Sequence, residues 1–272
     1  MRIEANPYAY LSHHGASPLV RLDVAADCWS VSADTDARPF NTVFAPDFAP
    51  EGLAERVRDV RRGAAVPGRA QDWWIGPSAR PSGLAACLAA LGFRALAPVR
   101  MMAAPLAGEE RGAHPAAAAE ARPVRSADAL ADFTAVHGAA YGTRPAAARF
   151  FHRALASLSL AEDAPMQHVV VRSAGAPVAV ASVFLHDGVA GLYNVATVPG
   201  ARGRGFGTAA ARAALAAARE RGAPRAVLGA EPGAAGMYRA LGFEDAGLLH
   251  RMRYVPPVRG APGRLRRAAG GR

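Results

Sequence analysis

The chain has 272 residues and a formal net charge of +10, and all 32 of its basic residues are arginine. A content of 51% hydrophobic and 7% aromatic residues is typical of a globular protein rather than a disordered one. Its apolar runs fall short of the ~18 residues that a membrane-spanning helix needs. The N-terminus also lacks the basic-then-apolar pattern of a signal peptide. We therefore expect no membrane partner, and a chain long enough for one large core or two ordinary ones.

The cysteine content indicates the cellular compartment, and the charge distribution indicates which binding partners to expect. Cys28 and Cys87 are too few for a disulfide framework, which predicts a cytoplasmic protein with free thiols. Arginines accumulate after Asp245, and we expect 256–272 to be a flexible basic tail. Because only Tyr254 interleaves with these arginines, stacking on single-stranded nucleic acid has little support. Nucleic-acid binding through the tail is therefore only a rival hypothesis. Our own expectation is that the protein has no nucleic-acid partner.

The first part of the chain predicts short strands alternating with helices. Strands are expected at Phe40–Phe44, Trp73–Ile75 and Leu96–Leu106, and helices at Glu51–Arg62 and Ser82–Leu91. The segment 107–121 is rich in Ala, Gly and Pro and has no apolar periodicity, which predicts a linker. It would separate a domain at 1–106 from one at 122–255.

The second part predicts two helices, then strands joined by tight turns, then a strand–loop–helix unit. Ser126 or Asp128 could cap the first helix. The expected strands are Arg122–Arg125, Gln167–Ser173, Val178–His186, Val189–Val198, Arg225–Leu228 and Phe243–Val255. The expected helices are Asp128–Tyr141, Ala146–Leu160, Gly207–Arg221 and Ala234–Leu241. Such an order predicts a mixed α/β sheet.

The segment Arg202-Gly203-Arg204-Gly205-Phe206-Gly207-Thr208 forms a glycine-rich turn between a predicted strand and a predicted helix. Glycine permits positive φ and close approach of the backbone to a ligand. The N–H groups at a helix start, together with the helix dipole, favour an anion such as phosphate or pyrophosphate. A dinucleotide-binding loop would lie early in its domain and be followed by an acidic residue, and a Walker loop needs lysine, which this chain lacks. Alternatively, the glycines could serve only to form the turn and bind no ligand.

These residues resemble the GNAT superfamily of acyl-CoA-dependent N-acetyltransferases. The family signature (Gln/Arg)-x-x-Gly-x-(Gly/Ala) matches Arg202–Gly207, and a second signature, Tyr followed by Gly-Phe, matches Tyr238 and Gly242-Phe243. The resemblance implies a mixed, mostly antiparallel twisted sheet flanked by helices. Leu91-Gly92-Phe93 repeats Leu241-Gly242-Phe243, so the chain is similar to tandem members of the family, with a partial N-terminal copy. That copy has the proline-rich Ala45–Pro50 in place of the glycine loop, and we expect it not to bind the anion.

The resemblance also implies a cofactor site and a reaction. Val195, Ala196 and Thr197 would offer backbone hydrogen bonds to the pantetheine arm of acetyl-CoA. The segment Arg202–Thr208 would cradle the pyrophosphate, and no metal is implied. The acceptor would be an amine of a small molecule or a peptide, attacking the thioester directly. Tyr238 would protonate the leaving thiolate, because a phenol can donate a proton to a developing thiolate.

The general base is not evident from the sequence. Glu231, just past a predicted strand, is one candidate, although it could equally be a helix N-terminal acid. His152, His168 and His186 are further candidates for the base, but an ordinary structural position explains each of them. Tyr193 and Asn194 lie on the strand that enters the site and could face substrate, although positions in the strand core explain them equally well. Trp73 and Trp74 are expected to pack in the core. A non-catalytic acyl-CoA-binding or scaffold protein with the same fold is the alternative function, and we expect a monomer or a homodimer.

Overall fold

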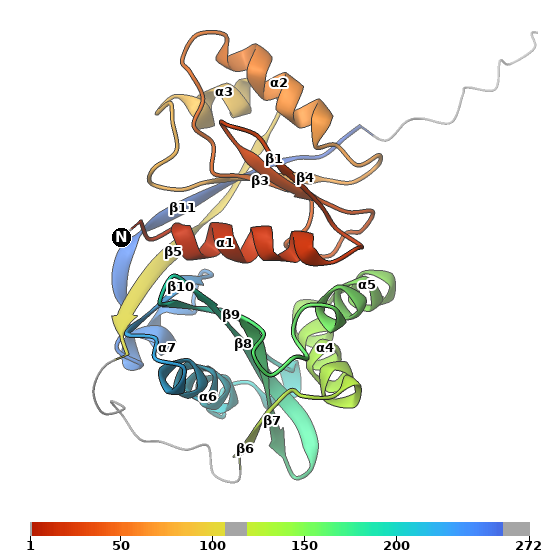
Figure 1. Ribbon diagram of the computed structural model, residues 1–272, viewed down its shortest axis with the longest axis vertical. Helices are drawn as coiled ribbons and strands as arrows, with labels where there is room; N and C mark the ends of the chain where they lie inside the picture. Colours follow the sequence, from red (N-terminus) through yellow and green to blue (C-terminus); the bar gives the residue numbers. More distant parts are fainter. Residues whose placement is uncertain (1, 107–118, 258–272) are drawn as a thin grey trace, which may run out of the picture.

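The computed structural model describes residues 2–106 and 119–257. One twisted sheet of eleven strands runs through the molecule in the order β1-β2-β3-β4-β11-β5-β10-β9-β8-β7-β6 (Figure 1). The first half contributes α1 (Ala5–His13), β1 (Arg21–Val24), β2 (Trp29–Ser32), β3 (Thr42–Phe44), α2 (Leu53–Gly63), β4 (Gln71–Ile75), α3 (Leu84–Ala90) and β5 (Arg94–Pro105). The second half contributes β6 (Ala119–Pro123), α4 (Ala127–Tyr141), α5 (Pro145–Ala156), β7 (Met166–Ser173), β8 (Ala176–His186), β9 (Val189–Thr197), α6 (Phe206–Glu220), β10 (Arg225–Ala230), α7 (Ala235–Ala240) and β11 (Glu244–Tyr254).

The predicted fold class is confirmed. Most paired strands run antiparallel, while β3–β4 and β9–β10 run parallel. Ser126 caps α4 by accepting a hydrogen bond from the Ala129 N–H at 3.2 Å, as one of the two predicted caps. Most of the expected linker, 107–118, lies outside the described residues, and its last residues begin β6. Nearly all of the expected tail, 258–272, also lies outside them. Within the described ranges, no helix has the length and apolar character that a membrane crossing requires.

The two halves exchange their last strands. β11, from the end of the second half, lies between β4 and β5 of the first half, and β5 in turn pairs with β10. The strands in the order β4-β11-β5-β10 therefore come alternately from the two halves. Gly92 and Gly242 both have φ of +87°, and Phe93 and Phe243 close their turns with backbone hydrogen bonds of 3.0 Å to the preceding helix. This matched geometry supports the inference of a partial internal copy.

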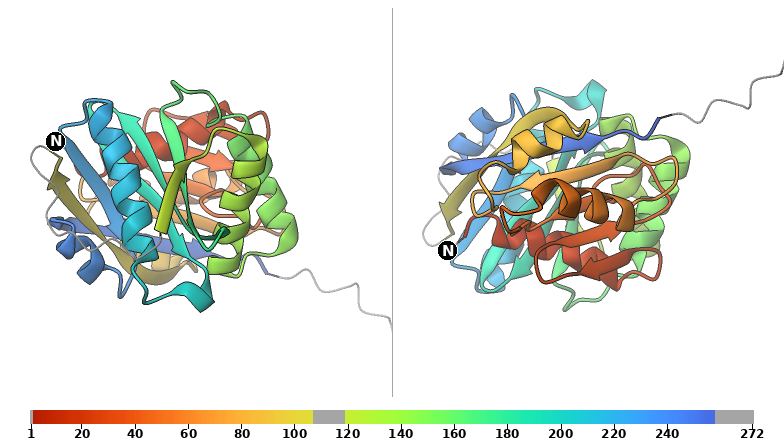
Figure 2. Two further views of the ribbon diagram at one scale, coloured as in Figure 1. Left: turned by 90° about the horizontal axis from the view of Figure 1, so that it is seen from below. Right: turned by 90° about the horizontal axis from the view of Figure 1, so that it is seen from above.

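Helices cover both faces of the second-half sheet. One face packs against α6, whose Ala210, Ala211, Ala214 and Ala218 are fully buried, and the small side chains let the helix approach the strands closely. The other face is covered by α4, α5 and α1. Figure 1 shows α1 between the first-half strands and β8–β10, and Figure 2 shows α2 and α3 over the strands of the first half. Helix α1 therefore belongs to both halves.

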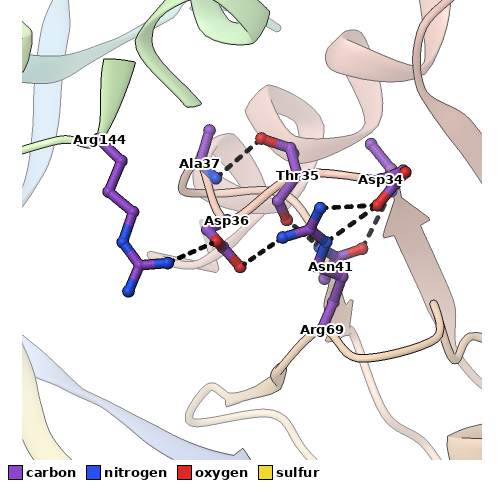
Figure 3. Close-up of polar contacts among 8 residues, drawn as sticks. Asp34, Thr35, Asp36, Ala37, Asn41, Arg69 and Arg144 are labelled. Atoms are coloured by element: carbon purple, nitrogen blue, oxygen red, sulfur yellow. Dashed lines mark hydrogen bonds and ion pairs between the residues drawn. The ribbon is translucent and has the colours of Figure 1, made fainter. Parts of the chain in front are cut away.

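The loop after β2 joins the first half to α5. Arg69 contacts Asp34 at 2.9 Å and Asp36 at 3.0 Å, and Asp36 also lies 3.4 Å from Arg144 at the N-cap of α5 (Figure 3). All four side chains are at least partly exposed, so each pair contributes little to the free energy of folding. They nevertheless show that the loop after β2 lies beside the turn between α4 and α5.

Candidate functional site

The glycine loop lies where β9 gives way to α6. A 3-10 turn over Pro199–Ala201 follows β9, and Gly203 and Gly205 then adopt φ of +74° and +83°. Gly205 is the N-cap of α6, and no side chain in the described part of the chain caps this helix. The first N–H groups of α6 have no carbonyl partner within the helix. The loop thus combines free donors with the positive end of a helix dipole, which suits a phosphate group.

The helix start is held close to the end of β9. A Cβ added at Gly207 would lie 3.1 Å from the Oγ1 of Thr197, so a larger residue would push the two segments apart. Arg202 reinforces the same junction, because its Nε donates to the Thr197 carbonyl at 3.2 Å and its Nη2 donates to the Ala140 carbonyl at 2.9 Å. The Arg202 side chain therefore ties the loop to β9 and to the end of α4.

Arg204 has a different environment from Arg202. Its guanidinium carbon lies 5.0 Å from the centre of the Phe206 ring, a distance typical of a cation–π contact. The residue is exposed, whereas Phe206 is 2% exposed. Both loop arginines are exposed, but the Arg202 guanidinium is hydrogen-bonded to backbone carbonyls while the Arg204 guanidinium lies over the Phe206 ring beside the N-terminus of α6.

Strands β9 and β10 separate beside this loop. Their parallel pairing runs from Val189 opposite Arg225 to Leu192 opposite Leu228 and then stops. Beyond that point the pairing of β9 with β8 shifts its register between Val180 and Ser182 of β8, and Asn194 of β9 has φ of +53°. The backbone of Val195–Thr197 therefore continues past the last pair with β10. An unpaired strand edge of this kind can hydrogen-bond an extended ligand.

Tyr141, at the end of α4, faces this separated edge. Its Oη donates to the Val195 carbonyl at 3.4 Å, and the residue is 56% exposed. Partial burial of the hydroxyl raises the pKa of Tyr141, the charge of Glu231 raises it further, and Arg202 opposes the shift. Tyr141 therefore lies within electrostatic range of two predicted site residues.

Tyr238 lies on α7, with its ring edge-on to Phe243 at 6.1 Å between centres. It is 7% exposed, and loss of hydration raises the pKa of its hydroxyl well above the ordinary value, with Tyr141 adding to the shift. The phenol is consequently protonated throughout the physiological pH range. A protonated phenol can donate a proton, and this is the state that the predicted role requires.

Glu231 is engaged by an arginine from the exchanged strand. Its carboxylate oxygens accept from Nη1 and Nη2 of Arg251 at 2.8 and 3.0 Å, and Nη2 also donates to the Ala97 carbonyl. Arg251 is 11% exposed, and its Nε–H is buried with no hydrogen-bond partner in the described residues. Both carboxylate oxygens of Glu231 are therefore committed to a two-armed ion pair.

A buried chain of polar side chains lies on the face of the sheet covered by α1 and α4. His168 and Ser182 are hydrogen-bonded at 2.7 Å, and Nδ2 of Asn194 donates to Ser182 Oγ at 3.0 Å and to Tyr10 Oη at 3.3 Å. Tyr10 stacks on Tyr193 with ring centres 3.8 Å apart. The sequence indicates His168, Tyr193 and Asn194 separately and does not show that they belong to one hydrogen-bonded and stacked cluster. The partner Tyr10 was missed because it comes from α1, which sequence analysis did not predict.

The other sequence candidates lie away from the separated edge. His186 is partly exposed beside Asp187 at the end of β8, and His152 is hydrogen-bonded to Thr134 Oγ1 at 3.2 Å on the α4–α5 pair. Trp73 is fully buried in the first-half core, while Trp74 is half-buried. In the described residues, no three His, Cys, Asp or Glu side chains are grouped so as to hold a metal ion.

The corresponding place in the first half is filled by the protein itself. The N–H groups of Asp47 and Phe48 donate to the carbonyls of Asp27 and Arg80 at 2.8 and 3.0 Å, and the Phe48 side chain is 4% exposed. Beyond β4, the Gly76 N–H donates to the hydroxyl of Tyr8 at 3.1 Å. These two loop N–H groups are therefore already used, whereas α2, which follows the loop, also begins at a left-handed Gly52 without a side-chain cap.

Sequence and structure comparisons agree with this geometry. Residues 128–243 match the Acetyltransferase (GNAT) family. The segment that contains the glycine loop and Tyr238 is a GNAT domain. A GCN5-related N-acetyltransferase from Kribbella flavida is 26% identical, with a TM-score of 0.70 over 92% of this chain and 95% of that one.

Two further solved structures share the GNAT fold over most of the chain. A GCN5-related N-acetyltransferase from Sphaerobacter thermophilus is 18% identical, with a TM-score of 0.63 over 88% of this chain and 84% of that one. A tandem GNAT protein from the clavulanic acid biosynthesis pathway is 16% identical, with a TM-score of 0.56 over 89% and 85% of the two chains. No curated protein is similar enough in sequence to match the chain. The GNAT fold thus extends beyond the matched segment into the first half.

Proposed function

We propose that this protein is an acetyl-CoA-dependent N-acetyltransferase whose single active site lies in the second half. The observation that carries the proposal is the uncapped N-terminus of α6 behind Gly203 and Gly205, which directly follows the separated edge of β9, and the buried phenol of Tyr238 on α7 supports it. The helix N-terminus would bind the pyrophosphate of CoA, the strand edge would bind its pantetheine arm, and the phenol would protonate the leaving thiolate. The GNAT domain supports the same class of reaction.

The residues of the second half fit CoA in a definite orientation. The N–H groups from Gly203 to Thr208 would bind the pyrophosphate, with Arg204 adding positive charge at the surface. Val195, Ala196 and Thr197 would pair with the pantetheine arm along the separated edge, in the place where Tyr141 now contacts the Val195 carbonyl. We therefore expect the Tyr141 side chain to move when CoA binds.

The chemistry then follows from the groups at the edge. The acceptor amine attacks the thioester carbonyl carbon, a C–N bond forms, and the C–S bond breaks. Tyr238 gives its proton to the departing sulfur, and solvent later restores it. Glu231 was the sequence candidate for the base. Its two-armed contact with Arg251 favours a structural role instead, because the ion pair would have to open before the carboxylate could accept a proton.

The loop of the first half differs from the glycine loop of the second half. The N–H groups of Asp47 and Phe48 are occupied, the Phe48 side chain is buried, and prolines stand where the second half has glycines, so we expect one CoA per chain. The acceptor is a small molecule or peptide that carries an amine.

Titration calorimetry with CoA and a thiol-release assay with acetyl-CoA and a panel of amines, amino acids and peptides test the proposal. We expect one CoA bound per chain and turnover with at least one amine. CoA binding without turnover across the panel would favour the non-catalytic alternative, and no CoA binding would refute both.

A further inference from the structure

A cavity lies at the start of β9 and β10, at the opposite end of these strands from the glycine loop. Its volume is about 320 Å³, within the range of small-molecule sites in proteins. It is bounded by the start of α1, by the β8–β9 turn at 186–189 and by the first residues of β10, and Figure 1 shows the start of α1 beside β10. The two ends of β9, Val189 and Thr197, are roughly 25 Å apart at about 3.3 Å per residue. The cavity is therefore distinct from the proposed pyrophosphate site.

The lining of the cavity combines an apolar wall with two unpaired arginines. Ile3, Val189 and Val227 line it and pack together in one apolar cluster. Arg2 and Arg225 line the same cavity and are exposed, and neither side chain has a hydrogen bond or ion pair with another described residue. A guanidinium group can bind a carboxylate through two parallel hydrogen bonds. The lining thus suits a ligand with one anionic end and an apolar body.

The acidic residues around the cavity leave this positive charge in place. Asp187 is the one acid among the lining residues, and its carboxylate is 88% exposed and lies 3.4 Å from Nε2 of His186. Glu4 precedes α1 and is bound elsewhere, because its carboxylate accepts from the Ser78 N–H at 3.1 Å. Two arginines therefore face one aspartate, and His186 adds positive charge when its ring is protonated. The cavity favours an anion over a cation.

Asn6 holds the walls of the cavity together. Its Nδ2 donates to the Val189 carbonyl at 2.9 Å and to the Phe184 carbonyl at 3.3 Å, which ties the start of α1 to both strands of the β8–β9 hairpin. Its Oδ1 accepts from the Tyr193 hydroxyl at 2.6 Å. These contacts form the walls before any ligand is present, so that binding requires little reordering of the protein.

We propose that this cavity is a second binding site, for a small organic acid whose carboxylate is held by Arg2 and Arg225 and whose apolar body lies against the sheet. The inference goes beyond acetyl transfer, since none of these residues belongs to the proposed CoA site. Both guanidinium groups are hydrated in the free protein, and exposed ion pairs are weak. We therefore expect a moderate affinity, with a Kd of about 1 mM for a six-carbon acid.

Titration of the full-length, nitrogen-labelled protein with hexanoate, followed by two-dimensional NMR, tests the site. We expect saturable shifts of the side-chain amide of Asn6 and of the backbone N–H of Gly188. Acetate, whose chain is shorter, should bind about tenfold more weakly or worse. Hexylammonium, which has the same chain and the opposite charge, should not saturate. The N–H signals of Gly203 and Gly205 should stay in place.

Charge-reversal variants identify the groups that hold the carboxylate. Arg225→Glu and Arg2→Glu should each raise the Kd for hexanoate about tenfold or more. Arg149→Glu is the matched control, because Arg149 is exposed on α5 and its side chain has no partner among the described residues. The Kd in R149E should stay within about twofold of the wild type.

Four results would overturn the proposal: no saturable shift with hexanoate, equal binding of hexylammonium, shifts confined to the glycine loop, or an unchanged Kd in R225E or R2E. An equal loss of affinity in R149E would also overturn it, since it would show an effect of net charge alone. Because the titration uses neither CoA nor turnover, its result is independent of the proposed function.

Discussion

Arg253 on β11 and Asp72 on β4 form a two-armed ion pair, with Nε to Oδ1 at 2.5 Å and Nη2 to Oδ2 at 2.6 Å. The two residues are direct partners in the β11–β4 register, and their side chains are 23% and 14% exposed. A residue near the end of the chain therefore secures the central strands of the first half. We expect Asp72→Ala to lower the free energy of unfolding by about 1–3 kcal/mol, because it leaves a largely buried guanidinium without its acceptors. Urea denaturation of the two proteins measures the difference.

The strand exchange predicts that the halves cannot fold apart. A fragment of residues 1–106 lacks β11, which separates β4 from β5, and a fragment of residues 119–272 lacks β5, which pairs with both β10 and β11. Each fragment alone should give the circular dichroism and broad NMR spectra of an unfolded or aggregated chain. Mixing them during refolding should restore the native spectrum. Independent folding of either fragment would contradict the exchange.

Gly205 offers a direct test of the anion cradle. Its φ of +83° is one that a β-branched residue adopts only with strain, so Gly205→Val should distort the N-terminus of α6. We expect the Kd for CoA to rise about tenfold or more. Gly200→Ala is the matched control, since that position has an ordinary φ and no atom within 4 Å of an added Cβ. Equal CoA affinity in G205V and G200A, measured by calorimetry, would argue against the loop as the phosphate site.

The parts of this structure that the sequence predicts are those with strong local signals. Gly203, Gly205 and Gly242 mark turns, and the alanine stripe and alternating strands of the second half fit regular periods. Helix α1 has no such signal: its buried face contains Asn6 and Pro7 beside Tyr10 and Leu11. Asn6 is buried because it bonds strand carbonyls at 3.3 and 2.9 Å, a contact that no local pattern indicates.

Long-range pairing limits prediction of the site in the same way. Glu231 is a plausible base in isolation, and only the exchange of β11 brings Arg251 against it. That contact depends on the place of β11 in the sheet, so the glycine turn could be predicted while the partner of Glu231 could not.

Tyr238→Phe removes only the proton that the leaving sulfur would receive. The ring and its contact with Phe243 remain, so the fold and the Kd for CoA should not change. We expect kcat to fall about 100-fold or more, as measured by thiol release at saturating acetyl-CoA. The loss should be smaller with an activated thioester whose thiolate leaves without protonation. A uniform loss with both donors, or unchanged kcat, would count against Tyr238 as the acid.

His14 and His168 should make the stability of the protein depend on pH. Both are almost completely buried, and loss of hydration lowers the pKa of His14 to about 4 and that of His168 to about 3. The folded state therefore keeps both rings neutral, whereas the unfolded chain binds protons below its ordinary histidine pKa of about 6.5. Stability is fully present above pH 6.5 and is lost as the pH falls from there towards 4. Each histidine should lower the free energy of unfolding by up to ~1.4 kcal/mol per pH unit in that window. Urea denaturation between pH 7.5 and 4.5 measures the slope, and His168→Asn should reduce it; a stability independent of pH in this range would mean that one or both rings are hydrated or paired in the folded state.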